Sequence, residues 1–158
     1  MKMSELCLCG SSQTYALCCA PYHLGESYPD NAEKLMRSRY CAYVKHNIPY
    51  IVNTTVPAQQ QGLDQKEMQT WSETTDWVKL EVVNFKEKVS KIHSQVEFKA
   101  YFNHQGQEHH HHELSTFTLI EGKWYFLDPT VEQKTTMKQP CICGSGKKFK
   151  QCCATFLG

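Results

Sequence analysis

The sequence lacks any run approaching the roughly 18 apolar residues that a membrane-spanning helix needs. Met1 to Leu6 also lacks the apolar stretch of a secretory signal. Neither sign of charge dominates, because 17 Lys and Arg residues oppose 16 Asp and Glu residues. This balance excludes a global attraction to nucleic acids or membranes. We therefore expect a cytoplasmic protein, and in that reducing compartment clustered cysteines bind metal or do redox chemistry more often than they form structural disulfides.

Cysteine is the residue type that organises the chain. All but one of the 9 cysteines fall into two groups, one near each end, that share the spacing C-x-C-x8-C-C. The predicted metal ligands are Cys7, Cys9, Cys18, Cys19, Cys141, Cys143, Cys152 and Cys153. Four thiolates in so short a segment can surround one tetrahedral ion, and coordination then stabilises a segment that is too small for a core.

All-sulfur sites with four ligands are typical of structural zinc, so we predict two Zn²⁺ ions per chain. The same ligand set leaves an iron–sulfur cluster and metal-free reactive dithiols as alternatives. Gly144 and Gly146 allow the tight turn that brings backbone N–H groups toward sulfur. Adjacent side chains on a helical turn diverge by roughly 100°, so Cys152 and Cys153 are expected to reach the same ion from one turn.

The segment from Cys141 to Cys153, CICGSGKKFKQCC, closely resembles the SEC-C motif at the tail of the bacterial SecA translocation ATPase. The segment from Cys7 to Cys19 resembles a divergent second copy, in which Ser12 replaces the second glycine and the basic residues are missing. In SecA the resembling module contacts the chaperone SecB and the ribosome. The resemblance therefore implies a docking surface.

The charge pattern restricts this implied surface to the C-terminal end. From Lys134 onward the chain carries five lysines and no acidic side chain. A filled zinc site with four thiolates has a formal charge of about −2, so this segment keeps a net positive charge when zinc is bound. We predict that Lys147, Lys148 and Lys150 dock an acidic protein partner or the ribosome. The alternative is that these lysines form an ordinary solvated face. Neither a membrane nor a DNA partner is expected.

The middle of the chain predicts an α+β domain. Helices are expected within Pro29 to Asn47 and Leu63 to Trp71, with a short segment at Tyr50 to Thr55 between them. Alternating apolar residues then predict strands around Val78 to Phe85, Val96 to Phe102, Leu114 to Ile120 and Trp124 to Leu127. The expected architecture is helices packed on a curved, cone-like antiparallel sheet that is flanked by two small zinc knuckles, with domains at 1–23, 24–133 and 134–158.

This order resembles the nuclear-transport-factor-2-like, or cystatin-like, cone. Four segments more narrowly resemble the uncharacterised YchJ-like bacterial family, in which a cone domain lies between SEC-C motifs. They are Leu35 to Tyr43, Thr75 to Trp77, Glu113 to Phe117 and Gly122 to Phe126. The resemblance spans nearly the whole chain and implies this architecture, but it implies no established substrate.

If the first helix lies along the concave sheet, it places an arginine and two tyrosines opposite residues from the strands. The predicted ligand pocket consists of Arg39, Tyr40, Tyr43, Trp77, Glu113 and Ser115. An aromatic cavity with one arginine and one carboxylate suits a small ligand or a peptide. The alternative is that the aromatic rings belong to the core and that Arg39 and Glu113 form an ion pair.

Two further features allow more than one interpretation. Alternate residues of the run His109 to His112 would face the same side of a strand and could bind a transition metal, whereas a polar run of this kind also suits a solvated loop that enters a strand. Cys41, the remaining thiol, is expected to be buried as a small apolar residue in the first helix.

Three functions follow from these features. The first is a non-catalytic zinc protein that docks a chaperone, the ribosome or a secretion component. The second is a small-molecule enzyme of the isomerase, dehydratase or hydrolase type, in which Asp76 or Glu113 would be the acid or base. The third is a redox switch in which oxidation ejects zinc from the paired thiols.

Overall fold

The structure, a computed structural model, describes residues 5–132 and 134–157. Its α-helices are α1 (Ala20–His23), α2 (Ala32–Val44), α3 (Ile48–Asn53) and α4 (Gln65–Thr74). Short 3₁₀ helices are η1 (Tyr15–Leu17), η2 (Pro57–Gly62), η3 (Phe149–Gln151) and η4 (Cys153–Phe156). The strands are β1 (Asp76–Ser90), β2 (His93–His104), β3 (Gln107–Ile120) and β4 (Lys123–Leu127). The α+β class is confirmed.

The four strands form one antiparallel sheet in the order β1-β2-β3-β4. The register of β1 against β2 shifts at three places, between Trp77 and Lys79, between Val82 and Asn84, and between Lys86 and Ser90. Such irregularities bend a strand and increase its twist. The outer edge of β4 is covered, because Val56 donates a backbone hydrogen bond to Phe126, and Phe126 donates one to Thr54.

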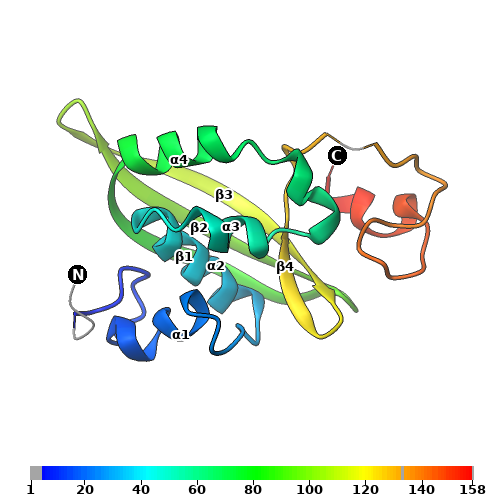
Figure 1. Cartoon of the computed structure of the whole chain (residues 1–158), viewed down its shortest axis with the longest axis horizontal. Helices are drawn as coiled ribbons and strands as arrows, with labels where there is room; N and C mark the ends of the chain where they lie inside the picture. Colours follow the sequence, from blue (N-terminus) through cyan, green and yellow to red (C-terminus); the bar gives the residue numbers. More distant parts are fainter. Residues whose placement is uncertain (1–4, 133, 158) are drawn as a thin grey trace.

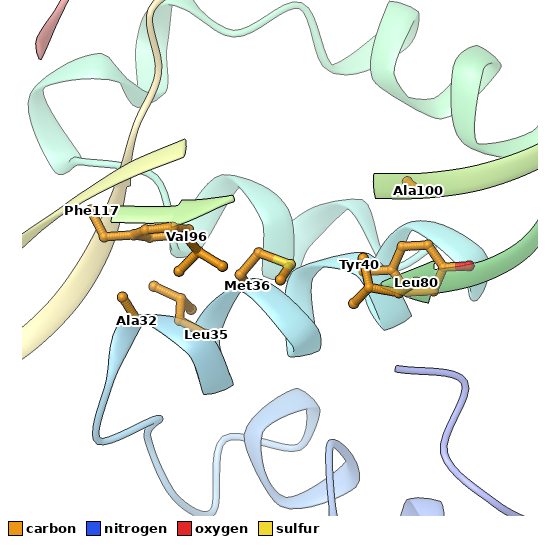
Figure 2. Close-up of a cluster of buried hydrophobic side chains, with 8 residues drawn as sticks. All are labelled: Ala32, Leu35, Met36, Tyr40, Leu80, Val96, Ala100 and Phe117. Atoms are coloured by element: carbon orange, nitrogen blue, oxygen red, sulfur yellow. The ribbon is translucent and has the colours of Figure 1, made fainter. Parts of the chain in front are cut away.

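Helix α2 packs the core against the sheet (Figure 1). It begins where the side chain of Asn31 accepts a hydrogen bond from the backbone N–H of Lys34, which satisfies one of the unpaired donors of the first turn. Its apolar residues recur at a spacing of three and four, so they share one face. Figure 2 shows this core, which consists of Ala32, Leu35, Met36, Tyr40, Leu80, Val96, Ala100 and Phe117.

The two cysteine segments lie at opposite ends of the molecule (Figure 1). We call residues 5–23 the N-terminal knuckle and residues 134–157 the C-terminal knuckle. The N-terminal knuckle packs against α2, and the C-terminal knuckle packs beside β4 and the turn between β1 and β2. The predicted domain limits at residues 1, 133 and 158 fall outside the described residues.

The histidine run differs from the prediction of a loop that leads into a strand. His109 to His112 lie wholly within β3, where all four are exposed. The hairpin turn lies at Gln105 and Gly106, so β3 begins two residues before the run. Within the described residues, no helix is long and apolar enough to cross a membrane.

We predict that Leu35→Ala lowers the free energy of unfolding by about 2–5 kcal/mol, because the fully buried Leu35 side chain leaves a cavity between α2 and the sheet. Urea unfolding followed by circular dichroism measures this loss. The matched control is Val83→Ala on β1, whose 46% exposed side chain should cost only a few tenths of a kcal/mol. Equal losses for both variants would contradict the placement of the core.

Candidate metal centres

The structure brings the predicted cysteines together in two groups of four. Within each group the four sulfur atoms all lie within 4.8 Å of one another. Seven of the eight side chains are buried, and only Cys18 is partly exposed. Each group therefore forms a closed candidate metal site with no position left for water or substrate, as in structural sites.

The distances between sulfur atoms fit a single ion. Tetrahedral zinc with bonds of about 2.3 Å places its sulfur ligands about 3.8 Å apart. Cys9 and Cys18 are separated by 3.5 Å, Cys18 and Cys19 by 3.9 Å, and Cys143 and Cys152 by 3.5 Å. The residues that are present therefore fit one tetrahedral ion per group.

The two knuckles repeat the same local structure. Cys7 donates a backbone hydrogen bond of 2.7 Å to Gln13, and Cys141 donates the equivalent bond of 2.8 Å to Lys147. A serine hydroxyl approaches the third cysteine in both, Ser11 at 3.0 Å from the sulfur of Cys18 and Ser145 at 3.4 Å from that of Cys152. The same cysteine spacing therefore gives the same turn in both knuckles. An inserted or deleted residue would break these matching contacts.

The adjacent cysteines do not lie on one helical turn, contrary to the expectation. Cys18 ends η1 and Cys19 precedes α1, while Cys152 separates η3 from η4. Cys152 has φ −133° and ψ −113°, which is not a helical conformation. This break in the backbone, rather than a helical period, turns both neighbouring side chains toward the same site.

The acidities of the thiols differ within each site. Hydrogen bonding from Cys19 lowers the pKa of Cys7 to about 6, and hydrogen bonding from Cys153 lowers the pKa of Cys143 to about 4. Burial raises the pKa of Cys18 to about 12 and that of Cys152 to about 11. Four thiolates at these distances repel one another, so a cation is required to hold all four in the ionised form.

The N-terminal site is fixed to α2 by polar contacts. Arg37 donates a hydrogen bond of 2.7 Å to the carbonyl oxygen of Cys9, and Glu33 orients this arginine through a contact of 3.0 Å. His23 links Tyr15 of the knuckle to the carbonyl oxygen of Ser38 in α2, with distances of 2.8 and 2.9 Å. These contacts hold the site against the core.

Cys41 of α2 is fully buried, as predicted, but its role extends beyond that of a small apolar residue. Its sulfur lies 3.9 Å from the sulfur of Cys7, so it packs directly on the N-terminal site. Hydrogen bonding from Cys19 and Cys7 lowers the pKa of Cys41 to about 4. Sequence spacing could not reveal this contact, because 34 residues separate Cys7 from Cys41.

The C-terminal site is joined to the sheet by His93, a residue that the sequence interpretation missed. Its Nε2 atom lies 3.4 Å from the sulfur of Cys153, and its Nδ1 atom lies 2.7 Å from the hydroxyl of Ser90. The ring also packs against Phe156, with centroids 4.5 Å apart. A histidine held in this way lies outside the quartet and can orient a cysteine ligand through its sulfur.

All six residues predicted for the ligand pocket line one cavity of about 560 Å³ between α2, α4 and the sheet. Arg39 and Glu113 do not form the alternative ion pair, since none of the described residues makes a salt bridge with Arg39. Glu113 instead accepts hydrogen bonds from Ser115 at 2.6 Å and lies 3.0 Å from His111. Asp76, the other candidate acid, is exposed and does not line the cavity.

The remaining predicted residues are at the surface. Lys147, Lys148 and Lys150 are exposed on the C-terminal knuckle. Within the described residues, the metal-ligand geometry found at the cysteines is not found among His109 to His112. His112 instead contacts Glu97 at 2.7 Å.

Comparison with known proteins matches the middle of the chain and both cysteine segments to known patterns. Residues 31–129 match the family model described as YchJ, middle NTF2-like domain. Residues 3–21 and 137–155 match the SEC-C motif. A UPF0225 protein of Actinobacillus succinogenes is 51% identical over 98% of this chain and 100% of that relative, and one of Haemophilus influenzae strain PittGG is 54% identical over 98% and 96%.

Two solved structures are similar in fold and sequence. The crystal structure of a SEC-C motif containing protein from Psychrobacter arcticus has a TM-score of 0.94 and 48% identity, and the match covers 99% of both chains. The solution structure of a SEC-C motif containing protein from Rhodopseudomonas palustris has a TM-score of 0.72 and 39% identity, covering 77% of this chain and 94% of that one.

We predict that the chain binds one ion per quartet and that Cys152→Ser lowers the bound metal from about two ions to about one. The reason is that a hydroxyl cannot replace a thiolate at a closed, all-sulfur site. Elemental analysis of protein purified without chelator measures the content. Thr155→Ser is the control, because it changes an exposed side chain of the same knuckle outside the quartet and should retain both ions. Unchanged metal in Cys152→Ser would contradict the assignment.

Ser12 provides a separate test of the N-terminal turn. Its φ is +70°, and the equivalent Gly146 has φ +86°, so serine occupies a left-handed conformation that favours glycine. Ser12→Gly should stabilise the metal-bound protein by up to about 1 kcal/mol, since the relieved strain exceeds the added entropy of the unfolded chain. Thermal unfolding measures the gain. The reciprocal change, Gly146→Ser, should destabilise, and equal effects of the two changes would refute this explanation.

Proposed function

We propose that this chain, which belongs to the UPF0225 family of YchJ-like proteins with SEC-C motifs, is a zinc-binding docking protein of the reducing cytoplasm. In this proposal the two ions are structural, and the basic C-terminal knuckle contacts an acidic protein segment. The observation that carries the proposal is that Lys147, Lys148 and Lys150 are exposed within the segment that the C-terminal cysteine quartet encloses. The closed cysteine sites themselves leave no open position for chemistry.

Zinc is the metal that best suits the cysteine quartets. The ligands are sulfur only, they are buried, and they are spaced for one tetrahedral ion. The cysteines of an iron–sulfur cluster bind different iron atoms and must stand further apart than ligands of a single ion. Zinc has no redox chemistry of its own, which agrees with a structural role.

The charge around the C-terminal knuckle supports an acidic partner. None of Lys147, Lys148 and Lys150 forms a salt bridge with a carboxylate of the described residues. A groove of about 510 Å³ runs between this knuckle and the turns that join β1 to β2 and β3 to β4, and Lys91 and Lys147 both line it. The N-terminal knuckle has the same local structure without these lysines, so the docking role falls to one end only.

Of the two acids that the sequence predicts for a small-molecule enzyme, Glu113 lines the cavity and Asp76 does not. Glu113 lies in the cavity between Ser115 and His111 and could exchange a proton with a bound substrate. Both of its oxygens already have a neighbour, because Ser115 donates a hydrogen bond to one and His111 lies beside the other. We therefore favour the docking function.

We predict that the triple variant Lys147→Glu, Lys148→Glu and Lys150→Glu loses a protein partner that the unmodified chain retains in a pull-down at moderate salt. The physical reason is that the substitutions reverse the charge that attracts an acidic segment. Binding should also weaken as salt rises, because exposed charges are screened. Quantitative mass spectrometry of the captured proteins measures the loss.

The matched control changes three other exposed lysines, Lys66, Lys79 and Lys86, to Glu. It alters the net charge equally but leaves the C-terminal knuckle intact, so it should retain the partner. Metal content verifies that both triple variants are folded. If the partner is lost equally from both variants, or if the unmodified chain captures none, the docking function is wrong.

A further inference from the structure

The cavity enclosed by α2, α4 and the sheet has a volume of about 560 Å³, which is within the range of small-molecule sites. It is distinct from the metal sites and from the lysines of the C-terminal knuckle. Its lining combines aromatic rings with one arginine, Arg39, and it also includes four carboxylates, those of Asp64, Glu67, Glu113 and Asp128. Whether a carboxylate ligand fits therefore depends on whether any of these four side chains already pairs with Arg39.

Arg39 is held rigidly at one end of the cavity. It is only 8% exposed, and its Nη1 atom donates to the carbonyl oxygen of Ile51 at 2.9 Å and to the hydroxyl of Thr54 at 2.7 Å. The guanidinium also lies over the ring of Phe126, 4.5 Å from its centroid. Because Nη1 and one face of the guanidinium are held in place, the edge formed by Nε and Nη2 is pre-organised to donate two hydrogen bonds.

That remaining edge has no protein partner. No described residue accepts a hydrogen bond from Nε or Nη2 of Arg39, and no described carboxylate lies within the 4.0 Å of an ion pair. Among the described residues, a fully buried side-chain atom without a hydrogen-bond partner is found at Thr118 but not at Arg39. Nε and Nη2 of Arg39 therefore keep some accessible surface, and Arg39 lines the cavity. Buried charges in proteins are paired or bind an ion of opposite charge.

The nearby carboxylates do not fill this role. Asp128 and Glu113 interact with Arg39 only over a longer range, and neither they nor Asp64 and Glu67 form an ion pair with it. Oδ1 of Asp128 accepts hydrogen bonds from the amide and hydroxyl of Thr130, and the two oxygens of Glu113 contact Ser115 and His111. The described carboxylates therefore leave the place of a bidentate partner for the guanidinium open.

Aromatic rings form another part of the cavity lining. Trp71 packs edge to face on both Tyr43 and Trp77, with ring centroids 5.1 Å apart in each pair. The rings of Tyr43 and Trp77 are tilted against each other, with centroids 6.3 Å apart. Trp71 is 44% exposed although it is a large apolar side chain, and it lines the cavity. Its exposed surface is available to a flat apolar group.

From these contacts we propose that the cavity binds a small carboxylate that carries a flat apolar group. The carboxylate accepts two parallel hydrogen bonds from Nε and Nη2 of Arg39, and the apolar group packs against Trp71 and Trp77. The site does not depend on the docking function of the C-terminal knuckle, and the two can fail independently.

Three probes of nearly equal size and shape test the charge requirement. The metal-loaded full chain is titrated with 3-phenylpropanoate, 2-phenylethylamine and 3-phenylpropan-1-ol, and binding is followed by calorimetry and by the fluorescence of Trp71 and Trp77. The carboxylate should bind in a saturable manner with one site per chain and at least about tenfold more tightly than the amine or the alcohol. Equal or tighter binding of the amine, or no saturable binding of the carboxylate, overturns the proposal.

Two variants locate the site. Arg39→Lys keeps the charge but loses the bidentate edge, so it should weaken binding of 3-phenylpropanoate by about tenfold. Because Arg39 also joins α2 to α3, a second variant is needed that does not disturb the fold. Glu113→Gln removes a negative charge from the cavity wall and should tighten binding of the carboxylate by roughly threefold at low salt.

The matched control for the second variant is Glu97→Gln. Glu97 also contacts a histidine of β3, His112 at 2.7 Å, but it does not line the cavity. This control should leave the affinity unchanged. If Glu113→Gln weakens binding of 3-phenylpropanoate, or if both variants change it equally, the carboxylate is not held beside Arg39 and the proposal is wrong.

Discussion

The grouping of four cysteine sulfur atoms in each knuckle is the constraint on which both ends of this molecule depend. Each knuckle consists of a few short turns, and the apolar residues that it buries pack around these cysteines. Coordination of one ion by the four sulfur atoms would fix four positions of the backbone at once. The middle domain has no such requirement, since α2 and the sheet bury a continuous apolar cluster.

The ends and the middle are nevertheless one structure, because each metal site is joined to the core by a specific polar side chain. Arg37 reaches the carbonyl oxygen of Cys9 from α2, and His93 reaches the sulfur of Cys153 from the start of β2. The cysteines therefore group their sulfur atoms into candidate metal sites on one side and present polar atoms to the core on the other. This arrangement fixes the direction in which the lysines of the C-terminal knuckle face the solvent.

Much of this organisation could be predicted from local sequence. The cysteine spacing identified both quartets, since all four ligands of a site lie within one short segment. Helical and strand periodicity was sufficient to place Arg39, Tyr40 and Glu113 around one cavity, because the periods assign side chains to faces. The contacts of Cys41 and His93 with the metal sites could not be predicted, because they depend on how distant segments pack. The break between adjacent cysteines was missed because two short 3₁₀ turns leave no periodic signal.

The irregular register of β1 also affects how the molecule behaves among its own copies. β1 is 15 residues long and forms an edge of the sheet, and a long flat edge would recruit the edge strand of a second molecule. Its bulges interrupt the row of backbone donors and acceptors, while Lys79, Lys86 and Lys88 add exposed charges along it. The irregular register and the lysines of β1 thus both work against pairing of this edge with a second molecule.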